Sequence, residues 1–120
     1  MVTIEDADYA EFYRDLSEEM EKYNGKVISF KGIVARDPQM PANCLLAGRH
    51  VMTCCADDIA FHPLVCVFSN PVSLKTRDWV QLTGKIKLEK HKLYHGEGPV
   101  LYVTETKITP PPVQEVATFY

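Results

Sequence analysis

The stretch Trp79-Val80-Gln81-Leu82-Thr83-Gly84-Lys85-Ile86-Lys87-Leu88 alternates between apolar and polar side chains. A period of two residues is typical of a β-strand that buries one face. Gly84 stands in the middle of the apolar face, and glycine at such a position allows a strand to coil tightly. The stretch therefore predicts one strand of a small, strongly curved sheet.

Four other stretches carry a strand pattern. One begins at Lys26 and places the following residues on a single face: Ile28, Phe30, Gly32 and Val34. The others are residues 44–55, 59–68 and 100–108, and Pro63 is expected to interrupt or bulge the second of these. Residues 90–99, with two glycines, are expected to form a polar hairpin connection. Because closure removes exposed sheet edges, five such strands predict a small five-stranded OB-like β-barrel. An open sheet covered by one helix is the alternative.

A single N-terminal helix is expected over about residues 8–24. Its apolar stripe follows a helical period and comprises Tyr9, Phe12, Tyr13, Leu16, Met20 and Tyr23. Asp8 followed by Glu11 resembles a capping box, and Asn24-Gly25 supplies a left-handed stop. We expect the stripe to pack against the sheet. The fold class predicted is thus mainly β with one N-terminal helix.

The composition is that of one globular domain. The chain has 120 residues, of which 46% are hydrophobic and 24% charged. We assign residues 1–120 to a single domain, with a helix over 8–24, a barrel over 26–109 and a proline-rich tail over 110–120. A net charge of −3 disfavours nucleic acid as a partner. The sequence lacks a signal-peptide pattern and an apolar run of roughly 20 residues, so we expect a soluble chain.

Chemistry-bearing side chains gather in the run Arg49-His50-Val51-Met52-Thr53-Cys54-Cys55-Ala56-Asp57-Asp58. Successive residues of a regular strand face opposite sides, so the two adjacent thiols reach one metal ion only if the chain bends after them. With such a bend, thiolate, imidazole and carboxylate groups suit zinc or another soft divalent ion. The candidate site residues are Arg49, His50, Met52, Cys54, Cys55, Asp57, Asp58 and His62. The expected metal ligands among them are Cys54, Cys55, Asp58 and His50.

Thiol redox chemistry is a related alternative. A disulfide between Cys54 and Cys55 would be strained and easily reduced, and Arg49 would lower the pKa of a nearby thiol. The other two cysteines, Cys44 and Cys66, stand among apolar residues and are expected to be inert and buried. No order of Cys, His and Asp identifies a catalytic triad, so no enzyme activity is predicted.

The same run resembles the "R-x-x-M-x-C-C-A-x-D" signature of the YcgQ-type family. Residues 78–86, Asp-Trp-Val-Gln-Leu-Thr-Gly-Lys-Ile, are similar to that family's "W-V-x-V-x-G" strand, and the proline-rich ending with a terminal Tyr is similar too. The likeness covers most of residues 26–120. Members of the family are regarded as subunits of two-component membrane permease complexes, in which this domain follows a membrane portion. The resemblance implies a permease subunit as partner, and membrane association where the domain belongs to a longer protein.

Three functions follow, in order of preference. The first is a non-catalytic accessory or recognition domain of a membrane permease complex, with no established biochemical activity. The second is a soft-metal-binding or thiol-redox domain centred on Cys54 and Cys55. The third is an oligonucleotide-binding OB module, in which aromatic rings stack on bases beside a basic stripe. The aromatic candidates are Trp79, Tyr94 and Tyr102, and the stripe comprises Lys85, Lys87, Lys90 and Lys92.

Overall fold

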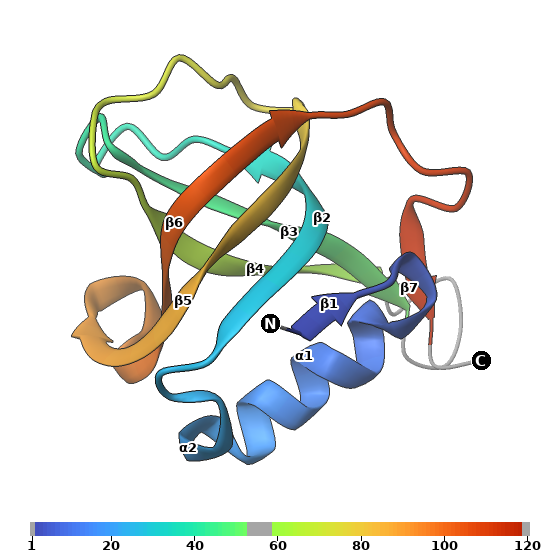
Figure 1. Ribbon diagram of the computed structural model, residues 1–120, viewed down its shortest axis with the longest axis horizontal. Helices are drawn as coiled ribbons and strands as arrows, with labels where there is room; N and C mark the ends of the chain where they lie inside the picture. The colour runs from blue at the N-terminus through green and yellow to red at the C-terminus, as the bar shows by residue number, and fades with distance from the viewer. Residues whose placement is uncertain (1, 53–58, 119–120) are drawn as a thin grey trace.

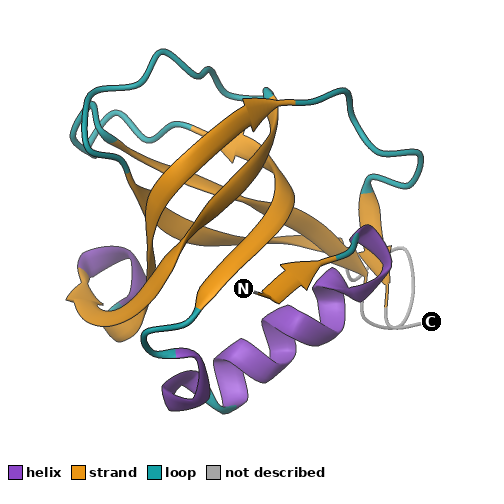
Figure 2. Cartoon of the chain, in the orientation of Figure 1, coloured by secondary structure: helices purple, strands orange, loops and turns teal. Residues whose placement is uncertain are grey.

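Strands make up about half of the chain in the computed structural model, which describes residues 2–52 and 59–118 (Figures 1 and 2). The strands are β1 (Val2–Ile4), β2 (Val27–Ala35), β3 (Cys44–Met52), β4 (Ile59–Val67), β5 (Trp79–His91), β6 (Gly96–Ile108) and β7 (Val116–Thr118). The α-helices are α1 (Tyr9–Glu18) and α2 (Met20–Tyr23), and the 3-10 turns are η1 (Asp6–Asp8) and η3 (Lys92–Tyr94). The predicted mainly β class is confirmed.

The seven strands form one sheet in the order β1-β2-β5-β6-β4-β3-β7, with an additional pairing between β2 and β3. That pairing joins β2, β5, β6, β4 and β3 into a closed circuit of hydrogen-bonded neighbours. Within the circuit only β4 and β6 run parallel. The predicted strand count of five is wrong because β1 and β7 were missed. Each has three residues, too few for a period of two to be recognised.

The β2–β3 pairing is short and ends in a fork. It covers only residues 33–35 of β2 and 46–48 of β3, after which the two strands diverge. Beyond the fork, β1 pairs in parallel with residues 28–30 on the edge of β2. On the other branch, β7 pairs in parallel with residues 50–52 on the edge of β3. The two ends of the described chain thus each complete one branch of the fork.

The N-terminal helix covers one end of the curved sheet (Figure 1). Its buried residues Tyr9, Phe12 and Leu16 join the main core. The predicted single helix over residues 8–24 is wrong in one respect, because Glu19 leaves the helical region with φ −131° and ψ 56° and separates α1 from α2. Asp8 makes no side-chain capping bond, so the expected capping box is absent. No helix in the described ranges is long and apolar enough to cross a bilayer.

The hairpin of β5 and β6 is longer than the sequence predicted. Each strand has 13 residues, and their register runs from Val80 opposite Ile108 to His91 opposite Gly96. The connection between the two strands is therefore residues 92–95 and not the expected 90–99. Main-chain pairing extends both strands into a stretch whose polar composition predicted a loop. The tail over residues 110–120 also differs from expectation, since it contains β7.

Gly48 sets how closely α1 approaches the sheet. A Cβ atom there would lie 2.4 Å from the His62 carbonyl oxygen and 2.8 Å from the Tyr9 hydroxyl. Tyr9 donates a hydrogen bond of 2.7 Å to the His62 carbonyl, and Tyr13 donates one of 3.1 Å to the Pro63 carbonyl. Pro63 itself does not interrupt β4, contrary to expectation. Two tyrosine hydroxyls thus hold α1 against β4, and Gly48 leaves room for this close contact.

Replacing Gly48 with alanine is expected to lower the free energy of unfolding by about 2 kcal/mol or more, because backbone atoms of β4 must shift to admit the methyl group. Urea denaturation measures the change. Ala60→Ser, which adds one heavy atom at an exposed position of β4, is the control and should stay within about 0.5 kcal/mol of the parent. Equal losses in both variants would contradict this account of Gly48.

Candidate functional site

The signature run occupies the end of β3 and the connection to β4. Met52 and Ile59 are the last register partners of these antiparallel strands. Arg49, His50 and Met52 lie in β3, and His62 lies in β4. The remaining candidate residues, Cys54, Cys55, Asp57 and Asp58, lie outside the described residues, so the convergence expected of them stays a prediction.

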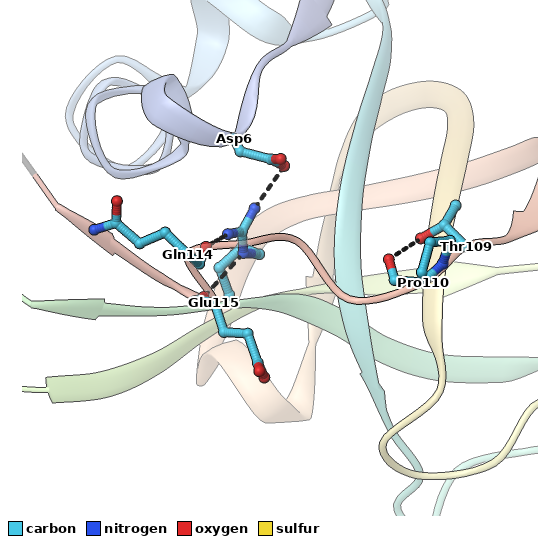
Figure 3. A network of polar contacts seen from close by, with 6 residues as sticks. Asp6, Thr109, Pro110, Gln114 and Glu115 are labelled. Atoms are coloured by element: carbon cyan, nitrogen blue, oxygen red, sulfur yellow. Dashed lines mark hydrogen bonds and ion pairs between the residues drawn. The ribbon is translucent and has the colours of Figure 1, made fainter.

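Arg49 is a buried charge in which each guanidinium nitrogen has a hydrogen-bond partner. Its side chain is 1% exposed. Its guanidinium donates to the Asp6 carboxylate at 2.9 Å and to the carbonyls of Gln114 at 2.6 Å and Glu115 at 3.2 Å (Figure 3). The guanidinium carbon also lies 5.3 Å from the centre of the Trp79 ring. A buried arginine needs such neighbours, because an unpaired charge away from water is costly.

These contacts place Arg49 at the fork between β2 and β3. Asp6 belongs to η1, just after β1, while Gln114 and Glu115 directly precede β7. One side chain thus holds both terminal segments against the sheet, and we call this set of contacts the Arg49 clamp. Its donors are directed at the clamp partners, which accounts for Arg49 structurally. The expected effect of Arg49 on a thiol of Cys54 or Cys55 stays a prediction. The sequence carries no signal for Asp6, because no pattern joins a residue to a partner 43 positions away.

His50 and Met52 lie on the outer face of β3. His50 is exposed, and its ring centre lies 5.0 Å from that of its register partner Phe61. Met52 and its partner Ile59 form the next pair on this face, and Ile59 is 42% exposed. We call these four residues the β3–β4 face. Phe61 and Ile59 were missed among the site residues, although alternation from His50 across the hairpin would have indicated them.

His62 lies on the opposite side of the same hairpin. It is the register partner of Arg49, and its ring packs 4.9 Å from that of Tyr13 in α1. Burial lowers the pKa of the His62 imidazole. Together with Ala10, Tyr13 and Val51 it lines a largely apolar hollow of about 340 Å³ between α1 and the hairpin. The structure therefore does not bring His50 and His62 together.

The two cysteines within the described ranges are free thiols. Cys66 is fully buried in the core, as expected, and burial raises its pKa. Cys44 is half-buried, and its pKa is raised by the same cause. Both thiols are therefore poor nucleophiles at neutral pH. Residues 2–52 and 59–118 hold no group of three or more His, Cys, Asp or Glu side chains placed to bind a metal ion.

Comparison with known proteins places the domain in a family. A family model described as the DUF1980 C-terminal domain matches residues 1–117. None of the curated proteins matches the chain. The match spans all the elements that build the fork, the clamp and the β3–β4 face, apart from the end of β7.

Replacing Arg49 with alanine is expected to lower the free energy of unfolding by about 3 kcal/mol, because it leaves the clamp carbonyls without donors and opens a void beside Trp79. Urea denaturation checks this. Asp6→Asn is the matched control, since Asp6 is 44% exposed and its loss keeps both carbonyl contacts. It should cost clearly less than Arg49→Ala, about 1–2 kcal/mol, because asparagine removes the counter-charge but keeps an oxygen that accepts from the guanidinium. A loss as large in Asp6→Asn as in Arg49→Ala would show that the carbonyl contacts do not matter.

Proposed function

The chain belongs to the family of DUF1980 C-terminal domains, and on that premise we propose that it is a non-catalytic recognition domain of a membrane permease complex. The permease context comes from the signature's resemblance to the YcgQ-type family. The role of a recognition domain is supported by what the signature residues do in β3. Arg49 is committed to holding the fold, while His50 and Met52 are presented outwards on a face with further apolar side chains.

The circuit of pairings supports an OB-like barrel. In chain order its five members are β2, β3, β4, β5 and β6, and the third pairs in parallel with the fifth. In OB folds the second and third strands, with the loops between strands one and two and between four and five, form the binding face. Here those strands are β3 and β4, and the loops are residues 36–43 and 92–95. The β3–β4 face is therefore where such a barrel would bind its partner.

The single observation that carries the proposal is the β3–β4 face itself. It combines an exposed imidazole that packs beside the Phe61 ring with the partly exposed apolar pair of Met52 and Ile59. Aromatic and methionine side chains are enriched at protein interfaces, whereas a small polar solute would need convergent donors and acceptors. We therefore commit to an apolar segment of the permease subunit as the occupant of this face.

Co-purification of the full-length protein with its permease tests this function. Ile59→Glu is expected to reduce the amount of permease recovered by roughly tenfold, because it places a charge at the centre of the apolar contact. Ile108→Glu is the matched control, since Ile108 is 70% exposed and lies away from the face. It should leave recovery unchanged. Equal recovery with both variants would rule out the β3–β4 face as the docking surface.

A soft-metal or thiol domain centred on Cys54 and Cys55 is the second candidate. Its support is the position of His50 and Met52, whose imidazole and thioether lie on one face of β3, close in sequence to the two thiols. Zinc or another soft ion accepts such donors.

Metal analysis of protein purified without oxygen tests this candidate. If it is correct, near-stoichiometric metal is lost when Cys54 and Cys55 become serine and is retained in Cys44→Ser. Thiol titration of the same sample adds a second readout. The raised pKa values of Cys44 and Cys66 slow their reaction, so any rapidly reacting thiol in metal-free protein belongs to Cys54 or Cys55. Protein without metal, whose thiols all react slowly, would exclude the candidate.

A further inference from the structure

We propose that the tip of the β5–β6 hairpin docks on an anionic lipid bilayer, with its lysines against the headgroups and Leu93 entering the interface. We call this region the basic tip, and it comprises Lys85, Lys87, Lys90, Lys92 and Leu93. The choice of a bilayer over other polyanions rests on the proposed membrane complex. The surface itself is argued from the geometry of the hairpin.

The basic tip begins at Lys85, where β5 leaves the rest of the sheet, and most of it extends beyond that point. Pairing between β2 and β5 ends at Lys85, and pairing between β4 and β6 begins only at Val100. Past Lys85, Ile86 still bonds the main chain of Gly25 and Lys26, and the Leu88 amide bonds the Asn24 side chain. From Glu89 to His91, β5 pairs with the start of β6 alone, and His91 lies opposite Gly96. Figure 1 shows this two-stranded extension projecting from the barrel-like body on the side away from β7. Its end is therefore free to meet a flat surface.

Tyr94 holds the tip in one position. Its hydroxyl donates to the Pro99 carbonyl at 2.6 Å and accepts the Val65 amide at 3.0 Å. Its ring packs over Gly98, where a Cβ atom would lie 2.3 Å from a ring carbon. Leu93, next to it in η3, is instead 40% exposed. Leu93 is thus exposed on a turn that Tyr94 holds in place.

The charge of the tip complements an anionic surface. Its four lysines are exposed, and none forms an ion pair with a carboxylate among the described residues. Two acidic side chains lie near these four lysines. Glu89 accepts a hydrogen bond from the Tyr102 hydroxyl, and Glu97 lies opposite Lys90 in the hairpin. Clusters of at least four basic residues bind anionic lipid, and an adjoining apolar side chain adds interfacial burial.

The aromatic side chains favour a bilayer over nucleic acid. Binding of single strands relies on exposed rings that stack on bases. Tyr94 is held within the tip, Trp79 is 8% exposed beneath the Arg49 guanidinium, and the Tyr102 ring has the Lys87 ammonium 5.1 Å from its centre. The accessible apolar group at the tip is an aliphatic leucine, which suits lipid and offers no stacking surface.

Vesicle sedimentation tests the proposal without any permease, so its outcome is independent of the β3–β4 face. The protein is expected to bind vesicles of phosphatidylserine and phosphatidylcholine, and not vesicles of phosphatidylcholine alone. Binding should be lost at about 1 M salt, where the Debye length is about 3 Å. Lys90→Glu with Lys92→Glu should weaken it at least about twentyfold, because each lysine near an anionic surface contributes roughly fivefold.

Two further variants make the test specific. Leu93→Ser should weaken vesicle binding about fivefold without altering its salt dependence. Lys75→Glu with Lys107→Glu, which makes the same charge change at exposed positions off the tip, should leave binding within about twofold of the parent. Equal losses in the two double variants would overturn the proposal. So would tighter binding to a single-stranded oligonucleotide that depends on the same lysines and not on Leu93. The Ile59→Glu variant should bind vesicles normally even if it loses the permease.

Discussion

The buried guanidinium of Arg49 is the contact on which the rest of the architecture depends. The circuit of strands closes through a pairing of only three residues from each of β2 and β3, and then opens into a fork. At that point the sheet would expose unpaired main chain to water or to the core. Arg49 fills the fork and binds the segments that follow β1 and precede β7, which lets these short strands pair on its two branches. Both ends of the domain are therefore fixed by one side chain.

The two sides of the β3–β4 hairpin separate the structural role of the signature run from its proposed binding role. The inner side carries Arg49, Val51 and His62, which meet the clamp and helix α1. The outer side carries His50 and Met52, which remain accessible. Because successive residues of a strand face opposite ways, one signature run can serve both roles at once. The part of the run that the structure describes thus combines a buried arginine with an accessible imidazole and thioether.

Local patterns predicted the long elements and failed where distant contacts decide the structure. Local strand patterns located all five strands of the circuit, and the glycine after Asn24 adopts the expected positive φ of 85°. The three-residue strands were missed because they form only against β2 and β3. Likewise, the length of the β5–β6 hairpin follows from pairing partners that no short window contains. For the site, the sequence identified the outward residues of β3, but the role of Arg49 depends on Asp6 and Gln114, which are remote in the chain.

Tyr94 gives the two proposed surfaces a fixed relation. Its hydroxyl bonds to the main chain of Val65 in β4 and of Pro99 in β6, so η3 and its exposed Leu93 are tied to the strand that also carries Ile59 and Phe61. A domain that rests its basic tip on a bilayer would consequently hold the β3–β4 face at a set angle to that bilayer. Such an arrangement limits the orientations in which a membrane-embedded partner is met, and so raises its effective concentration at the face. A rigid tyrosine anchor, in place of a flexible loop, is what this coupling requires.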